Sequence, residues 1–312
     1  MKKIGLLALS LYIGYSSFAQ SPYDQVDFLK EGKANVKMGG KVAKSFVENP
    51  TFINDYYFNQ ATFMKGESQA KPVSNAASVF SDVTLLGISP EGMQKLVEEL
   101  YIHMVGELDK IGFKLVDGDA LLQTKAAQDQ IAKGKNNFMI GQTGDEPIFD
   151  KQSAFDIGVY GVKERLYFRP AGKNVYVFTG NIPGTFYGKV AAAEKTNMIS
   201  VGYNITFANF KGSSTISSNK LKTQAGLEVT PVIQLVNPDG LFTWITFGQS
   251  YEGKNDWSEG LIETDKNDGS YWGISSNAAY SLVADEAKYL DELRKIIMAM
   301  QVDIAAAIKA EM

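Results

Sequence analysis

The stretch that decides the fold is residues 82–117, DVTLLGISPEGMQKLVEELYIHMVGELDKIGFKLVD. It opens on a short apolar run that predicts a buried strand, formed by Leu85, Leu86 and Ile88. Ser89 suits the N-cap of a helix over 90–111, because its hydroxyl can accept a hydrogen bond from an amide of the first turn. Gly112 ends that helix, and the alternating segment 113–116 predicts a second strand.

The predicted helix carries one continuous apolar stripe at three- and four-residue steps, which is typical of a helix packed on a core. The stripe consists of Met93, Leu96, Val97, Leu100, Tyr101, Met104, Val105, Leu108 and Ile111. Two strands joined by a helix of ~22 residues are expected to lie parallel, with a right-handed crossover. The stretch therefore predicts a βαβ unit that opens a domain.

Helical and strand patterns alternate along the rest of the chain. A second helix is predicted over 120–133 and a short strand over 138–141. The clearest strand pattern is a strict two-residue alternation of Ile199, Val201, Tyr203, Ile205 and Phe207. An Asn-Pro-Asp-Gly turn at 237–240 predicts a hairpin between the strands that flank it, and a long helix is predicted over 285–310.

This order of elements predicts an α+β fold, with a mixed β-sheet, the βαβ opening unit, helices packed on one face and a long C-terminal helix. We expect three parts along the chain: a signal peptide over 1–19, an N-terminal extension over 20–75 and the α+β domain over 76–312. The polar, glycine-containing segments 211–226 and 248–270 are predicted to be loops.

The first residues have the pattern of an export signal. Lys2 and Lys3 precede a short apolar core, and small residues at 17 and 19 predict cleavage after Ala19. We therefore expect a periplasmic or secreted protein. The absence of cysteine excludes disulfides, thiolate metal sites and a lipid anchor on cysteine. No later stretch reaches the ~18–20 apolar residues that a membrane-spanning helix needs.

Charge limits the classes of partner. The formal net charge is −4 at pH 7 and the lysines are scattered, which argues against nucleic acid. Only three residues are arginine, namely Arg165, Arg169 and Arg294. The glycines around 180–188 lack the spacing of a phosphate-binding loop, and we expect no cofactor.

Three patterns resemble catalytic or metal sites but have simpler interpretations. His103 is the single histidine and lies at four-residue spacing from Glu99 and Glu107, so helical partners explain it better than general-base catalysis. The acidic segment 263–268 departs from the EF-hand pattern and favours a polar turn. The aspartates of 117–119 suit a turn and a helix cap, although paired glycosidase carboxylates leave no local signature.

Aromatic residues supply the candidate binding surface. Trp257, Tyr271 and Trp272 are the binding candidates, within the segment 248–272. They could equally be core or strand residues, because aromatic side chains favour strands. Pro231 lies within a strand pattern and predicts an edge or a bulge, which would be a second exposed surface. No catalytic or metal-binding residue is predicted.

The layout over roughly 80–250 resembles the amino-terminal domains of the curli-secretion (CsgG-like) and TolB families. The resemblance rests on the strand 83–88, the helix 90–111, the strand 113–117, a second helix and the strand 138–141. It implies a bacterial envelope protein that works by binding or assembly. The chain departs from the curli-secretion lipoproteins in lacking the lipidated cysteine, and no functional residue carries over.

Two hypotheses of function follow from the sequence. The first is an exported, non-enzymatic bacterial envelope protein that binds or assembles with an envelope or secretion-system protein or another envelope component. The alternative is a secreted hydrolase that uses carboxylates on a polysaccharide. A deep cleft with two facing carboxylates about 5–9 Å apart would favour the hydrolase.

Overall fold

The computed structural model describes residues 34–36, 45–69, 78–116, 120–121, 123–133, 138–140, 148–150, 161–171, 176–178, 183–214, 219–247, 251–253, 256–267 and 276–312. The predicted signal peptide and the early part of the predicted extension therefore lie outside the described residues, apart from a short strand at 34–36. No helix in these described ranges has the length and apolar character needed to cross a membrane.

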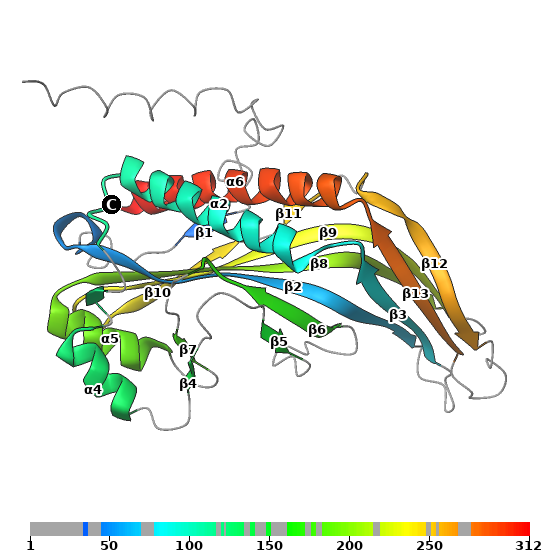
Figure 1. Cartoon of the computed structure of the whole chain (residues 1–312), viewed down its shortest axis with the longest axis horizontal. Coiled ribbons are helices and arrows are strands. Elements are labelled where there is room, and N and C mark those ends of the chain that lie inside the picture. The colour runs from blue at the N-terminus through cyan, green and yellow to red at the C-terminus, as the bar shows by residue number, and fades with distance from the viewer. Residues whose placement is uncertain are drawn as a thin grey trace, which may run out of the picture.

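A curled mixed sheet organises the fold, which confirms the α+β class (Figure 1). Its main path is β1-β10-β9-β8-β2-β3-β13-β12. The bounds of these strands are β1 Ala34–Val36, β2 Thr51–Gln69, β3 Ser78–Leu86, β8 Asn197–Ser214, β9 Asn219–Val236, β10 Phe242–Phe247, β12 Ser258–Asn267 and β13 Ser276–Ala284. Shorter strands join this path through β2 and β9, namely β5 Ile148–Asp150, β6 Gly161–Phe168 and β11 Tyr251–Glu252. A separate ladder joins β4 Phe138–Ile140 to β7 Tyr176–Phe178.

Strand β2 is the centre of the sheet rather than part of an extension outside the domain. Residues 51–60 pair in parallel with β8, and residues 63–69 pair antiparallel with β3. The opposite edge pairs with β6 over residues 58–65. The boundary predicted after residue 75 therefore separates β2 from a sheet to which it belongs. The sequence signal for this strand is the aromatic segment 52–58, in which Tyr56 and Phe58 pack in the main core and Phe52 packs in a second apolar cluster.

The long β8–β9 hairpin replaces the loop predicted over 211–226. A bulge between Thr206 and Ala208 marks where β8 leaves β2, and the outer half of the hairpin folds over β2 and β3. The ring of Phe210 covers Gly66, and the Ser81 and Thr223 hydroxyl oxygens are 2.7 Å apart. A bulge of this kind bends a strand, so that its two halves can belong to two packed layers of sheet. The polar composition of 211–226 suggested a loop, but it arises because the outward face of this hairpin is polar.

Two strand-to-helix units lie side by side and form the main body of the domain. β3 and β13 are parallel neighbours in the sheet, and each leads into a long helix. These helices are α2 Pro90–Lys110, with N-cap Ser89, and α6 Glu286–Glu311, with N-cap Asp285. Ser89 donates hydrogen bonds from its amide (2.9 Å) and hydroxyl (2.5 Å) to one carboxylate oxygen of Glu286. This contact lowers the pKa of Glu286 and places its negative charge at two positive helix ends.

The predicted βαβ unit is correct in the position of its first strand and in its helix but wrong in its second strand. The first strand is also less buried than predicted, because Leu85 is half-buried and Leu86 is 45% exposed. Residues 113–116 form only an isolated parallel bridge, between Leu115 and Thr51. The segment follows a helix of 21 residues, so it emerges at the far end of the sheet, where it meets only the first residue of β2. The parallel neighbour of β3 is β13, from the other end of the chain.

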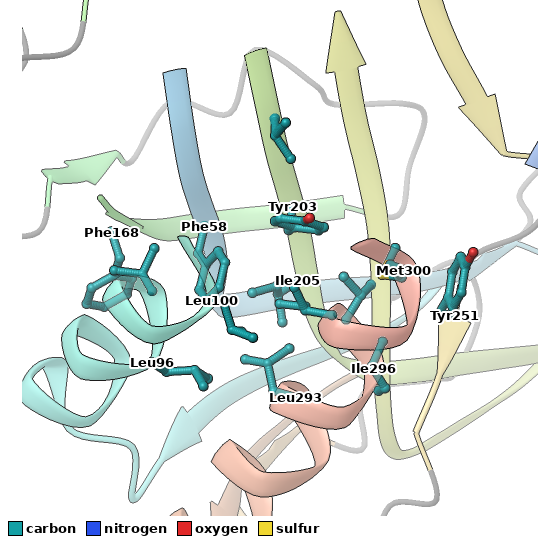
Figure 2. Close-up of a cluster of buried hydrophobic side chains, with 14 of the residues drawn as sticks. Phe58, Leu96, Leu100, Phe168, Tyr203, Ile205, Tyr251, Leu293, Ile296 and Met300 are labelled. Atoms are coloured by element: carbon teal, nitrogen blue, oxygen red, sulfur yellow. The ribbon is translucent and has the colours of Figure 1, made fainter. Parts of the chain in front are cut away.

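The main core lies between the sheet and the helix pair α2–α6 (Figure 2). Leu96 and Leu100 of α2 meet Leu293 of α6 in this layer. The sheet contributes the alternating residues of β8, which are all buried as predicted: Ile199, Val201, Tyr203, Ile205 and Phe207. Burying a large apolar side chain contributes about 1.5–3 kcal/mol, so this layer is the main source of stability.

Helices cover both faces of the sheet, which corrects the prediction that they pack on one face. α4 Lys125–Lys133 and α5 Pro183–Glu194 lie on the side opposite α2 and α6 (Figure 1). A second apolar cluster joins them to the sheet through Phe52, Leu121, Ala127, Val190, Ala191, Met198 and Val236. The sequence prediction missed α5 because its glycines suggested a loop, although Pro183 suits a first helical turn.

The hairpin turn at 237–240 is confirmed. Asn237 and Gly240 close the turn with a backbone hydrogen bond of 2.9 Å, and Gly240 has the positive φ of 75° that glycine tolerates. Pro231 lies in β9, between the residues paired with β10 and those paired with β11. It therefore occupies a local gap in the pairing on that side. Pro231 is itself buried, so it does not mark an exposed surface.

A like-charge pair near the end of the β8–β9 hairpin predicts a stabilising substitution. Lys211 and Lys222 are exposed and directly opposite each other in the ladder. Opposed like charges destabilise a strand pair, so Lys211→Glu is expected to raise the free energy of unfolding by about 0.5 kcal/mol. Urea denaturation measures the change. The double variant Lys211→Glu/Lys222→Glu restores repulsion and is expected to lose the gain; if it keeps the gain, pairing is not the cause.

Candidate functional site

Polar residues gather on the sheet face that points away from α2 and α6. A bulge between Ile53 and Asp55 sets the alternation of β2, so that Tyr56 enters the main core and Asp55 points to the opposite face. Register places the matching residues of β6 and β8 beside them. We define the polar face as Asp55, Tyr57, Asn59, Arg165, Tyr167, Arg169, Ser200 and Asn204.

The centre of the polar face is ordered by contacts between neighbouring strands. Tyr57 lies opposite Gly202, and a side chain at that glycine would overlap the tyrosine ring. The Tyr57 and Tyr167 ring centroids are 6.2 Å apart. Asn59 donates a hydrogen bond of 2.7 Å from its amide nitrogen to the side-chain oxygen of Asn204. The face is thus a fixed surface of two aromatic rings and several amide and charged groups.

A buried ion pair lies at one end of the polar face. The Arg169 Nε and Asp55 Oδ1 atoms are 3.8 Å apart, and the two residues are 5% and 8% exposed. Burial raises the pKa of Asp55 from 3.8 to about 6, although Arg169 and the Tyr56 amide act in the opposite direction. Burial also raises the pKa of Tyr57, and the negative charge of Asp55 adds to that effect. A carboxyl in this range changes its charge near neutral pH.

Several buried polar atoms on this face have no hydrogen-bond partner among the described residues. They are Asp55 Oδ1, Asn59 Oδ1, Arg165 Nε and Arg169 Nε. An unsatisfied buried donor or acceptor costs about 1–3 kcal/mol, so a group of them in one place is unusual for a purely structural surface. The arrangement can donate hydrogen bonds to an anionic group and accept a proton at Asp55.

The binding candidates predicted from the sequence are not brought together on a described surface. Trp257 is fully buried (0% exposed), and its ring packs edge-on against Tyr289 at 4.9 Å between centroids. It is therefore a core residue, which corrects its expected position on a loop surface. Tyr271 and Trp272 lie outside the described residues.

His103 has the structural role that its helical spacing predicts. Its Nε2 is 3.5 Å from a carboxylate oxygen of Glu107, while Glu99 pairs with Arg294 at 2.8 Å. The sequence did not reveal its second partner, Gln301 of α6, whose side-chain oxygen is 2.6 Å from His103 Nδ1. His103 thus joins α2 to α6.

The acidic segments occupy other positions. Glu263 and Asp265 lie on β12, next to a bulge, rather than in the predicted turn. The aspartates of 117–119 are outside the described residues. Within the described part of the chain, no three His, Cys, Asp or Glu side chains form a group that could hold a metal ion. The absence of a cofactor stays a prediction.

The raised pKa of Asp55 predicts a pH-dependent effect of Asp55→Asn. A carboxyl with a raised pKa binds its proton more tightly in the folded state, so its contribution to stability declines as the pH rises from 3.8 toward about 6. The neutral amide does not ionise. Asp55→Asn is therefore expected to match the parent near pH 4 and to exceed its free energy of unfolding at pH 7.5 by roughly 1–3 kcal/mol. Urea denaturation across this range measures the difference, and a difference independent of pH would contradict the assignment.

Comparison of the chain with protein-family models, with curated proteins and with solved structures finds no match. The resemblance to the CsgG-like and TolB amino-terminal families therefore stays a sequence-based prediction.

Proposed function

We propose that this chain is an exported, non-enzymatic protein of the bacterial envelope that binds a protein or another envelope component through the polar face. The observation that carries the proposal is the set of buried polar atoms on that face that have no hydrogen-bond partner among the described residues, beside the half-buried rings of Tyr57 and Tyr167. Polar groups of this kind fix the orientation of a bound partner, while aromatic rings supply contact area. The export pattern of the first residues supports the envelope location.

The test is a crosslinking pull-down from intact cells with separation of periplasm and outer membrane. Tyr167→Ala changes the polar face, and Ile102→Ala changes an exposed residue (61% exposed) on α2, which covers the opposite face. The parent and Ile102→Ala are expected to recover the same envelope partner, and Tyr167→Ala is expected to lose it while its circular dichroism stays unchanged. Retention of the partner by a folded Tyr167→Ala variant would contradict the proposal.

Asp55 favours a second candidate function, the carboxylate-dependent hydrolase. A carboxyl group with a pKa of about 6 suits general acid or base catalysis near neutral pH. A glycosidase also needs a second carboxylate about 5–9 Å away. A soluble, partnerless protein with glycan turnover that Asp55→Asn abolishes would establish this alternative in place of the binding function.

A further inference from the structure

Arginine is rare in this chain, and most of it is on the polar face. Of 31 lysines and arginines only three are arginine. Arg294 pairs with Glu99 on the helix side of the sheet. Arg165 lies in β6 and Arg169 directly follows that strand, and these two residues are 7% and 5% exposed. The arginine guanidinium differs from the lysine ammonium because it holds its N–H donors in a plane. This planar arrangement matches the two oxygens of a carboxylate.

The two arginines lie four residues apart on the same face of the sheet, with Tyr167 between them and opposite Asn59. The positive charges of Arg169 and Arg165 both oppose the rise in the pKa of Tyr57. Asp55 Oδ1 is 3.8 Å from Arg169 Nε, which is beyond hydrogen-bond distance, and that donor has no hydrogen-bond partner in the described part of the chain. The Arg165 Nε is also without a partner among the described residues. The β5–β6 ladder places Asp150 opposite Arg165.

We propose that Arg169, together with Arg165 and the Tyr57 ring, binds the carboxylate group of an organic ligand on the polar face. This inference rests on the proposed function and adds the chemical class of the ligand. A carboxylate only accepts hydrogen bonds, so it satisfies the unpartnered guanidinium donors directly. The Tyr57 and Tyr167 rings offer an apolar surface to the carbon skeleton beside the carboxylate.

Asp55 makes this binding depend on pH. Among the described residues, Arg169 lies 3.8 Å from Asp55, Arg165 and Arg169 both act on the charge of Tyr57, and the Tyr167 ring centroid is 6.2 Å from that of Tyr57. An ionised Asp55 competes with the ligand for Arg169, whereas a protonated Asp55 does not. Binding is therefore expected to strengthen on the order of tenfold between pH 7.5 and pH 5.5, because the protonated fraction of Asp55 rises over this range.

The experiment is isothermal titration of the purified exported protein with three probes: acetyl-dialanine, its carboxy-terminal amide, and succinate. At least one of the two carboxylates, acetyl-dialanine or succinate, is expected to bind. The carboxy-terminal amide of acetyl-dialanine is expected not to bind. Binding of the peptide alone identifies a chain end as the ligand, and binding of succinate alone identifies a small organic acid. Equal binding of acetyl-dialanine and its amide, or no binding of either carboxylate, overturns the inference.

Two variants test the assigned residues. Arg169→Lys keeps the positive charge but removes the planar fork, and it is expected to weaken carboxylate binding at least about tenfold. Asp55→Asn is expected to bind equally at pH 5.5 and pH 7.5. Unchanged affinity in a folded Arg169→Lys variant overturns the assignment. The result can be told apart from that of the pull-down. If the protein still recovers a partner that depends on Tyr167 but binds no carboxylate, this inference fails and the proposed function stands.

Discussion

Replacing Trp257 with alanine is expected to lower the free energy of unfolding by about 3–5 kcal/mol, the range for deleting a large aromatic side chain from a core. The indole is fully buried against Tyr289, whose hydroxyl donates a hydrogen bond of 2.9 Å to Gln60. The Trp257 carbonyl also accepts a hydrogen bond of 2.8 Å from the amide of Asp285, the N-cap of α6. The alanine variant keeps this backbone hydrogen bond, so the expected loss comes from the core contacts of the ring.

Urea denaturation followed by circular dichroism measures this effect. Trp257→Phe keeps an aromatic ring next to Tyr289 and serves as the matched control, with a smaller expected loss. A Trp257→Ala variant that keeps its stability within about 1 kcal/mol and loses a binding partner would contradict the core assignment and return Trp257 to a surface role.

Replacing Gln301 with methionine is expected to lower the free energy of unfolding by about 2–4 kcal/mol, through lost hydrogen bonds rather than lost volume. Gln301 is fully buried and connects three elements. Its side-chain nitrogen donates to the Tyr56 hydroxyl (2.7 Å) and to the Leu100 carbonyl (3.0 Å), and its oxygen lies 2.6 Å from His103. The substitution removes these three contacts, and the buried Tyr56 hydroxyl loses its Gln301 partner.

A double-mutant cycle tests this origin. Tyr56→Phe removes one of the groups that Gln301→Met leaves unsatisfied, so the two changes together are expected to cost less than the sum of the single changes. Thermal and urea denaturation of the four proteins measure the interaction. Additive losses would show that the hydrogen bond from Gln301 to Tyr56 contributes little to stability.

Local features of the fold are predictable from the sequence because their causes lie within a few residues. Ser89 accepts the predicted hydrogen bond from the Gly92 amide at 3.0 Å, and Gly112 has the positive φ of 95° expected after a helix. The turn at 237–240 and the alternation along β8 are equally local. Each of these features follows from a single helix cap, a single glycine or a two-residue alternation of apolar side chains.

Strand pairing was the part that local patterns could not predict. β3 pairs in parallel with β13, which lies near the other end of the chain, and nothing in residues 82–117 specifies that neighbour. The segment 113–116 has a strand pattern but reaches only Thr51. Partner choice depends on the whole sheet, including the bulges after Ala61 and after Thr206, near the point where β2 changes its partner from β8 to β3.

The candidate site was missed for a related reason. The bulge after Ile53 decides that Asp55 and Tyr57 point to the polar face, and a bulge has no clear mark in this sequence. One signal was present, since two of the three arginines lie four residues apart, at 165 and 169. Their meaning depended on burial and on the neighbour Asp55, which lies on a different strand.

The polar face is the proposed binding surface. The most direct test places a photo-crosslinking phenylalanine derivative at Tyr167 or, as a matched control, at Ile102 on α2, and irradiates intact cells. A discrete crosslinked partner is expected from position 167 and none from position 102. A partner captured from position 102 alone, or no partner from position 167 in a folded protein, would contradict this proposal.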